Sequence, residues 1–200
     1  MSQHSESATI RYYDDHADEY VSGTTGVDME SLYQPFLELM PKGGKILDAG
    51  CGSGRDAKAF LDLSYRVTAI DASAKMVEAT TRLTGQPAQQ QRFQDLNSRG
   101  EFDGIWACAS LLHVPLMELD DVLVRFATAL HPGGICYVSF KEGDGERTEG
   151  GRQFTDFTEN GLRERLRQEV SFDVVRTWIT TDLRPGRSDE RWVNALVRKV

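Results

Sequence analysis

The order of apolar and amphipathic segments between residues 45 and 140 constrains the fold more than any other feature. Short apolar segments predict strands, and longer segments with apolar residues three and four apart predict helices. The predicted strands cover residues 45–49, 65–70, 90–93, 102–108 and 135–140, and the predicted helices cover 55–63, 73–83 and 115–130. Because strands alternate with helices, the sequence predicts an α/β fold with a parallel sheet covered by helices on both faces.

The segments on either side of this core follow a different pattern. They predict helices at 9–22, 28–40 and 158–169, a charged loop with four glycines at 141–153, and strands at 172–181 and 191–200. The connection between the last two strands is too short for a helical crossover, so these strands are expected to form an antiparallel hairpin. No internal repeat and no domain boundary is visible, and we expect residues 1–200 to form a single domain.

Composition makes several classes of protein unfavourable. The chain has 200 residues, enough for one sizeable core, and its net charge of −8 makes a nucleic-acid partner unfavourable. No apolar stretch is long enough to span a bilayer, and residues 1–11 lack the apolar run of a signal peptide. The three cysteines lie in or beside apolar segments, without the spacing of a metal site. These features indicate a cytoplasmic protein that binds neither metal nor membrane.

A glycine-rich turn follows the first predicted strand and precedes a helix, which is typical of a nucleotide-type site. Its spacing is Gly50-x-Gly52-x-Gly54, and Arg55 stands where a dinucleotide fingerprint has its third glycine. The Lys-Ser/Thr ending of a phosphate loop is absent as well. Asp48, two residues before the first glycine, would repel a pyrophosphate but suits a ligand with an ammonium group and no phosphate.

A second acid, Asp71, ends the next predicted strand. A carboxylate at this place can accept hydrogen bonds from both hydroxyl groups of a ribose. Asp71 therefore indicates a nucleoside ligand, although it does not separate NAD from S-adenosylmethionine.

Five segments in order resemble the motifs of class I S-adenosylmethionine-dependent methyltransferases, in particular the small-molecule enzymes of methyltransferase type 11/12. They are residues 46–54, with the glycine turn; 67–73, with Asp71; 93–96; 102–114; and 130–134, with Leu-His-Pro-Gly-Gly. The resemblance implies a Rossmann-like three-layer sandwich with a seven-stranded, mostly parallel sheet of order 3-2-1-4-5-7-6, in which strand 7 is antiparallel. It also implies that residues 44–140 bind the cofactor S-adenosylmethionine, and that S-adenosylhomocysteine is the product.

The resemblance also assigns cofactor contacts residue by residue. Gly50, Cys51, Gly52 and Gly54 would approach the methionine part, with backbone at Ala107, Cys108 and Ala109 near the ammonium group; Asp71 and Ala72 would meet the ribose, Met76 and Leu96 the adenine faces, and Asp95 the adenine N6. Asp48 is expected to organise the pocket or to tie down loop N–H groups. Arg55 is expected either to steer the ligand's carboxylate or to be a solvated helix residue, and Asp95 could likewise be a solvated loop acid.

The N-terminal tyrosines form a further candidate group. The pattern Tyr13-Asp14-x-x-Ala17-x-x-Tyr20 resembles the lid helix of small-molecule members of the family, so residues 1–40 are expected to form a helical lid. Tyr13 and Tyr20 would then contact the cofactor, since aromatic faces suit a sulfonium cation. The alternative is an amphipathic helix that only packs on the core.

The acceptor site is less constrained. His113 follows the fourth strand and is expected either to act as a general base or to line the substrate site. Tyr12, Arg152 and Phe154 are expected to bind substrate, and the loop at 141–153 is expected to be either a mobile lid or a solvated connection. Together with the last helix and hairpin, this loop makes up the third part of the domain, residues 141–200.

The fourth strand does not end in Asn-Pro-Pro-Tyr or Asp-Pro-Pro-Tyr, the sequence with which other members cradle exocyclic or side-chain amino groups. We therefore expect a monomer or homodimer that transfers a methyl group to a small-molecule acceptor. The alternatives are a nucleic-acid or protein methyltransferase that depends on a partner, and a non-catalytic S-adenosylmethionine-binding subunit. The sequence does not identify the acceptor atom or decide whether a base is used.

Overall fold

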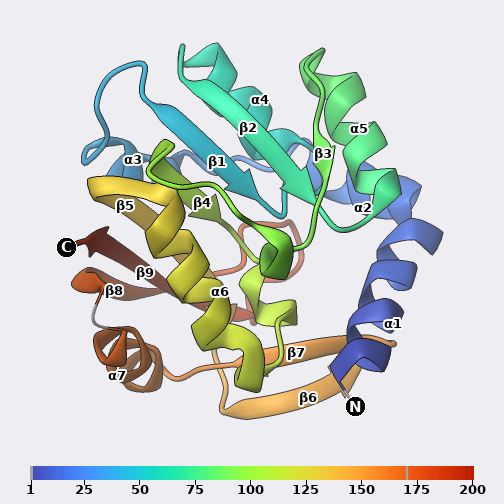
Figure 1. The fold of residues 1–200 in the computed structure, drawn as a ribbon. Helices are drawn as coiled ribbons and strands as arrows, with labels where there is room; N and C mark the ends of the chain where they lie inside the picture. The colour runs from blue at the N-terminus through green and yellow to red at the C-terminus, as the bar shows by residue number, and fades with distance from the viewer. Residues whose placement is uncertain (1, 170) are drawn as a thin grey trace.

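The computed structural model describes residues 2–169 and 171–200. Its central sheet has seven strands in the order β3-β2-β1-β4-β5-β9-β8 (Figure 1). The strands are, in that order, Gln89–Gln90, Arg66–Asp71, Lys45–Ala49, Phe102–Ala107, Leu130–Lys141, Arg191–Lys199 and Phe172–Thr181. β1 to β5 run parallel, and β9 is antiparallel to both of its neighbours. Counted within this sheet, the order is 3-2-1-4-5-7-6, and the predicted fold is confirmed.

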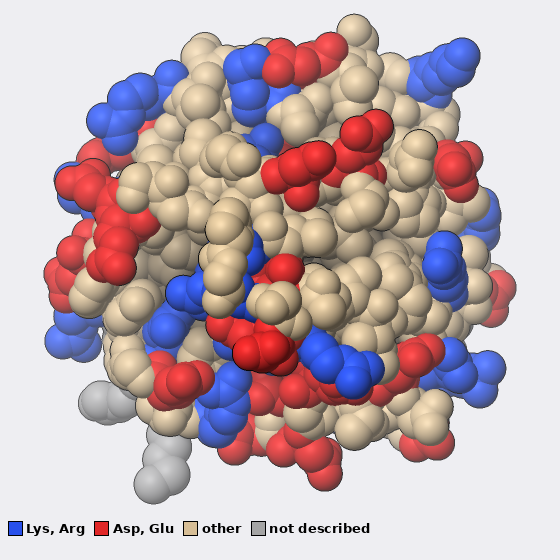
Figure 2. All heavy atoms as spheres, turned by 180° about the vertical axis from the view of Figure 1, so that it is seen from behind, with Lys and Arg blue, Asp and Glu red and all other residues tan. Residues whose placement is uncertain are grey.

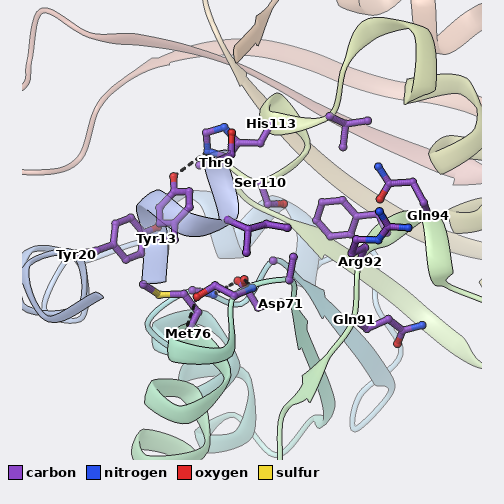
Figure 3. Close-up of a pocket in the computed structure, with 18 residues that line it drawn as sticks. Thr9, Tyr13, Tyr20, Asp71, Met76, Gln91, Arg92, Gln94, Ser110 and His113 are labelled. Atoms are coloured by element: carbon purple, nitrogen blue, oxygen red, sulfur yellow. Dashed lines mark hydrogen bonds between the residues drawn. The ribbon is translucent and has the colours of Figure 1, made fainter. Parts of the chain in front are cut away.

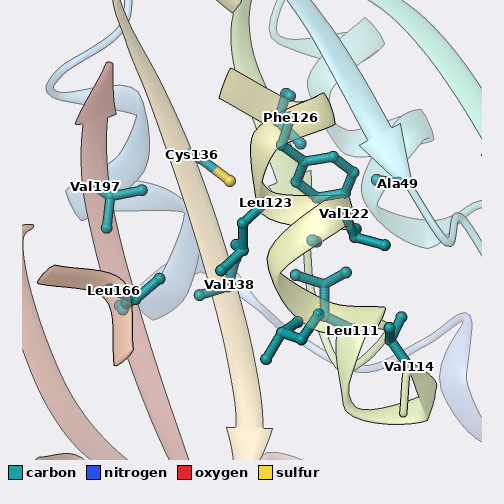
Figure 4. Packing of buried hydrophobic residues seen from close by; sticks show 14 of the residues in the cluster. Ala49, Leu111, Val114, Val122, Leu123, Phe126, Cys136, Val138, Leu166 and Val197 are labelled. Carbon is teal, nitrogen blue, oxygen red and sulfur yellow. The ribbon is translucent and has the colours of Figure 1, made fainter. Parts of the chain in front are cut away.

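Helices cover both faces of the sheet, as the alternation of segments requires. α6 (Leu116–Ala129) and α7 (Glu159–Gln168) pack on one face, and α3 (Glu30–Leu37) and α4 (Arg55–Asp62) pack on the other. Because successive strand residues point to opposite faces, Leu47 and Ala49 join the first core while Ile46 joins the second. Figure 4 shows the first core, where side chains of α6 meet Cys136 and Val138 of β5.

Two segments differ from the predicted elements near the N-terminus and after β3. The helix predicted at 9–22 is two helices, α1 (Ser2–Asp15) and α2 (Ala17–Thr24), which separate at His16. The strand predicted at 90–93 is only β3, Gln89–Gln90, and a 3-10 helix at Phe93–Asp95 follows it. α5 (Ala74–Thr84) begins as predicted, because the Ser73 hydroxyl accepts a hydrogen bond from the backbone N–H of Met76.

The prediction of a loop at 141–153 is wrong, because most of this segment belongs to a β-hairpin. β6 (Gly145–Glu149) pairs antiparallel with β7 (Arg152–Asp156) in a separate two-stranded sheet. The two-residue turn is Gly150-Gly151, with φ of +56° and +79°, and glycine is favoured at both central positions of such a turn. The pair of glycines between two alternating segments was the signal for a hairpin. Figure 1 shows this hairpin beside α1, far from the sheet's β3 edge.

Charged side chains are spread over the molecular surface. On the face shown in Figure 2, Lys and Arg alternate with Asp and Glu and leave no continuous basic stripe. Among the described residues, no helix is both long and apolar enough to cross a membrane.

Candidate functional site

A cavity opens at the carboxyl ends of β1, β2 and β4, where parallel α/β sheets bind their ligands. Figure 3 shows how side chains from distant parts of the chain converge there. The lining comprises Thr9, Ile10, Tyr13, Tyr20, Gly50, Gly52, Asp71, Ala72, Ser73, Met76, Gln91, Arg92, Phe93, Gln94, Ala109, Ser110, His113 and Val114. The glycines, Asp71, Ala72, Met76, Ala109 and both tyrosines were predicted for this place. The motif at 93–96 was predicted as well, but through Asp95 and Leu96 instead of the lining residues at 91–94.

The glycine turn leaves no room for side chains on the cavity side. Gly50 and Gly52 have φ of +81° and +53°, which disfavours other residues. A Cβ on Gly50 would run into Ser110, and a Cβ on Gly52 would come within 3.2 Å of the Tyr20 ring. Glycine is therefore required for Ser110 and Tyr20 to pack against the turn. Gly50 and Gly52 also line the cavity, so a ligand there can contact their backbone.

Gly54 and Cys51 are at the back of the turn instead of at the cavity. A Cβ on Gly54 would lie 2.8 Å from the Thr80 Cα of α5, so glycine is needed there for helix packing. The Thr80 hydroxyl donates to the Cys51 sulfur over 3.2 Å. These two residues shape the turn through α5 and do not line the cavity.

Asp71 is fixed at the cavity by the backbone around it. Its carboxylate accepts hydrogen bonds from the N–H groups of Gly52, over 3.0 Å, and Ser73, over 2.9 Å. Burial raises the pKa of Asp71 to about 6, although these two N–H donors oppose the shift. A ligand hydroxyl that donates to this carboxylate would favour its charged form.

Asp48 does not line the cavity. It shares a strand face with Ile46, so its side chain points toward α4. Among the acidic groups, Asp56 has the largest effect on the pKa of Asp48. Burial, followed by the charge of Asp56, raises the pKa of Asp48 well above its usual range, and its Oδ2 has no hydrogen-bond partner. The predicted role in organising the pocket is therefore indirect, through the strand end that carries the turn.

Arg55 is tied to Asp56 and lies away from the first cavity. Its Nε and Nη2 donate to the two carboxylate oxygens of Asp56 over 2.6 and 2.9 Å. Asp56 also accepts from the Tyr33 hydroxyl over 2.5 Å and from the Trp106 Nε1–H over 2.9 Å. Asp56 was missed by sequence reasoning, since nothing in the local sequence shows that a tyrosine and a tryptophan meet it.

The structure does not bring Asp95 and Leu96 to the cavity. Asp95 is exposed and paired with Arg92 over 2.9 Å, and Leu96 is buried in the core. The 3-10 helix turns Asp95 outward and leaves Gln94 on the lining, with its Oε1 buried and unpaired. Ala107 is likewise inside the core, whereas Cys108 and Ala109 follow the strand end.

A second cavity of about 690 Å³ adjoins the first. Its walls come from α1, α2, the β6–β7 hairpin and the segment at 180–192, and they include Tyr12, Arg55, Cys108, Lys141, Arg152, Phe154 and Arg184. Tyr13, Tyr20, Ala109 and His113 line both cavities. The residues predicted for cofactor and for substrate thus meet at one junction.

His113 links the N-terminal helix to the hairpin at this junction. Its Nδ1 lies 2.7 Å from the backbone oxygen of Gln153, and its Nε2 lies 2.8 Å from the Tyr13 hydroxyl, as Figure 3 shows for the tyrosine. Because a carbonyl oxygen only accepts, Nδ1 carries the proton and Nε2 accepts from Tyr13. Burial lowers the pKa of His113 to about 4, and the charges of Arg152 and Lys141 act in the same direction.

This shift predicts a pH-dependent stability. A histidine with a folded pKa of about 4, against 6.5 when unfolded, binds fewer protons in the folded state. Its contribution is therefore complete above pH 6.5 and is lost as the pH falls toward 4, by about 2–3 kcal/mol. His113→Asn keeps a donor for Gln153 but cannot titrate, so its free energy of unfolding should fall less between these pH values.

Urea unfolding of both proteins across this range measures the difference. Asp71 has the opposite shift, which contributes stability at low pH that is lost as the pH rises through about 6. Since Asp71 is present in both proteins, subtraction isolates His113. If the free energy of unfolding changes with pH in the same way in wild type and in His113→Asn, the pKa of this histidine is not depressed.

Among the described residues, no group of histidine, cysteine and acidic side chains is arranged to hold a metal.

Comparison with known proteins gives one family match: residues 46–134 match a sequence model described as a methyltransferase domain. A curated relative is the ubiquinone biosynthesis O-methyltransferase of Xanthomonas axonopodis pv. citri, 31% identical over 108 residues. The match covers 50% of this chain and 44% of that protein, so the chain spans less than half the length of the relative.

Solved structures show the same fold over nearly the whole chain. The Burkholderia thailandensis 1,6-didemethyltoxoflavin-N1-methyltransferase, with 1,6-didemethyltoxoflavin and S-adenosylhomocysteine bound, is 24% identical, with a TM-score of 0.78 and coverage of 98% of this chain and 87% of that one. The [4+2]-cyclase SpnF is 17% identical, with a TM-score of 0.74 and coverage of 98% and 96%. At such identities the likeness concerns the fold alone. The domain match over residues 46–134, the similarity to curated O-methyltransferases and the sheet order together support a class I S-adenosylmethionine-dependent methyltransferase.

Proposed function

We propose that this chain transfers a methyl group from S-adenosylmethionine to a small molecule held in the second cavity. The observation that carries this proposal is the junction, where Tyr13, Tyr20, Ala109 and His113 line both cavities. Two ligands in the two cavities would meet there, which is the arrangement that a direct transfer between them requires.

The first cavity fits the cofactor at several points. Gly50 and Gly52 open the backbone to the methionine part, and Asp71 offers a fixed carboxylate to the ribose hydroxyls. Met76 and Phe93 provide apolar contact for the adenine, and Gln94 replaces Asp95 as the residue for its amino group. When bound, S-adenosylmethionine supplies a methyl group on a cationic sulfur and leaves as S-adenosylhomocysteine.

The chain's own residues align the ligands and exclude water. Tyr13 and Tyr20 meet edge to face with ring centroids 5.2 Å apart, and such rings attract a sulfonium. The hydrogen bonds that hold α1 over the cavities include two besides that of Tyr13: the Asp14 carboxylate accepts from the Ser73 hydroxyl over 2.6 Å, and the Thr9 hydroxyl accepts from the Gln153 N–H over 3.0 Å. The N-terminal helix therefore serves as the cover of the site.

The Tyr13–His113 pair is an ionisable contact at the junction of the two cavities. The Nε2 lone pair of neutral His113 already accepts from Tyr13. An acceptor that loses a proton would pass it to the Tyr13 oxygen while the phenol proton moves to Nε2. The low pKa of His113 makes it a weak base, so this route suits acceptors that are themselves acidic.

Asp71→Ala tests the cofactor site. Loss of the carboxylate removes charge-assisted hydrogen bonds to the ribose, so affinity for S-adenosylhomocysteine should fall by about 1–3 kcal/mol. Titration calorimetry measures this directly. The matched control is Asp95→Ala, since Asp95 is an exposed acid outside the cavity and its removal should leave the affinity unchanged.

The two variants separate the competing assignments. Unchanged affinity in Asp71→Ala would contradict the ribose role. A loss in Asp95→Ala equal to that in Asp71→Ala would instead support the adenine contact that the family resemblance implies. Tight cofactor binding without formation of S-adenosylhomocysteine on a panel of thiols, amines, phenols and carboxylates would favour a non-catalytic binding subunit.

A further inference from the structure

Arg152 of β7 is the unbalanced charge in the wall of the second cavity. The other cations on this wall have carboxylate partners: Arg55 pairs with Asp56, Lys141 and Arg187 with Glu190, and Arg184 with Asp182. Within the described part of the chain, no carboxylate lies within ion-pair distance of Arg152, and its Nε is buried without an acceptor. Glu149 stands opposite Arg152 in the hairpin but is held by Arg147.

Aromatic rings surround this guanidinium. Its central carbon lies 4.3 Å from the centroid of the Tyr12 ring and 5.2 Å from that of Phe154. The ring of His113 lies 5.0 Å from Phe154, so the aromatic wall continues to the junction of the two cavities. Stacking on rings satisfies the faces of a guanidinium but not its N–H donors, which require acceptor oxygens. The guanidinium hydrogen-bonds to the Tyr13 side chain, but its buried Nε has no acceptor.

The charge of Arg152 also reaches the junction. It acts to lower the pKa of His113, whose shift is mainly due to burial, and it opposes the burial that raises the pKa of Tyr13. A bound sulfonium would add a further positive charge to this region. A negative group on the second ligand would balance both charges, and arginine binds planar oxyanions particularly well.

We propose that the methyl acceptor is an aromatic compound that carries an oxyanion, a carboxylate or a phosphate ester, bound by the guanidinium of Arg152. Its ring packs against Tyr12 and Phe154, and the cavity of about 690 Å³ is of the size that holds such a molecule. This inference rests on the proposed function only in calling the ligand a methyl acceptor. The oxyanion site itself is a property of the second cavity.

Calorimetry on the S-adenosylhomocysteine-loaded protein tests the proposal with three probes that share one ring: 4-hydroxybenzoate, its methyl ester and phenyl phosphate. At least one of the two anions should bind at least about tenfold more tightly than the neutral ester. Arg152→Gln should remove this preference while leaving the affinity for S-adenosylhomocysteine unchanged. The matched control is Arg176→Gln, because Arg176 also lies over an aromatic ring, that of Trp178 at 4.9 Å, but is exposed and outside the cavity.

Several outcomes would overturn the proposal. They are equal binding of ester and anions, an anion preference that survives in Arg152→Gln, and no binding of either anion at millimolar concentration. Inorganic phosphate that binds as tightly as phenyl phosphate would overturn the aromatic part. A protein that fails to bind S-adenosylhomocysteine would instead contradict the proposed function. The same titrations on the cofactor-free protein would then still show whether Arg152 binds the anionic probes.

Discussion

Replacing Gly50 with alanine is expected to unfold the glycine turn and to abolish measurable cofactor binding. The backbone at Gly50 has φ of +81°, where an L side chain costs about 1–2 kcal/mol. The added Cβ would also collide with Ser110, and relief of that overlap costs about 1–3 kcal/mol more. Ser110 cannot shift freely, because its hydroxyl donates to the backbone oxygen of Ala49 over 2.7 Å.

Gly85→Ala is the matched control for this variant. Gly85 has φ of +70°, but a Cβ there would meet nothing within 4 Å. This variant should lose only about 1–2 kcal/mol of unfolding free energy and keep its affinity for S-adenosylhomocysteine. Urea unfolding and calorimetry on both variants separate backbone strain from crowding. Equal losses of stability, with cofactor binding retained in Gly50→Ala, would contradict the close approach of a ligand to the turn.

The core of the fold was predictable because each of its elements is specified locally. The apolar strands at 45–49 and 102–108 each follow a charged or glycine-rich turn, and Ser73 caps the helix that follows β2. The hairpin at Gly145–Asp156 was not predicted, because its composition is that of a solvated loop. Its strands alternate weakly, and only the Gly150-Gly151 turn carried the signal.

The site was predictable where its residues are fixed by a strand end or a tight turn. Gly50, Gly52 and Asp71 lie at the cavity because the backbone places them there. Asp95 and Asp48 do not line the cavity, for opposite reasons: a 3-10 helix rotates Asp95 into solvent, and strand alternation turns Asp48 toward α4. Contacts that join distant segments, such as His113 with Gln153, depend on tertiary packing that no local pattern encodes.

Asp56→Asn is expected to cause a large loss of stability, although Asp56 lies outside both cavities. Asp56 is buried and accepts from three side chains, those of Arg55, Tyr33 and Trp106. Although burial alone would raise its pKa, Arg55 and the two hydrogen-bonding aromatic residues hold the pKa below its ordinary value. An uncharged amide would leave the Arg55 charge unbalanced and turn a donor toward other donors, at a cost of about 3–5 kcal/mol.

Because the folded pKa of Asp56 is depressed, the carboxylate stabilises the fold above its unfolded value of 3.8, and this contribution is lost as the pH falls below it. The difference in unfolding free energy between wild type and Asp56→Asn should therefore shrink on acidification. Asp62→Asn is the control, since Asp62 is an exposed acid of the same helix, paired with Lys58, and should cost at most about 0.5 kcal/mol. If the two variants lose equal stability in urea, Asp56 does not organise the face of the sheet on which α3 and α4 pack.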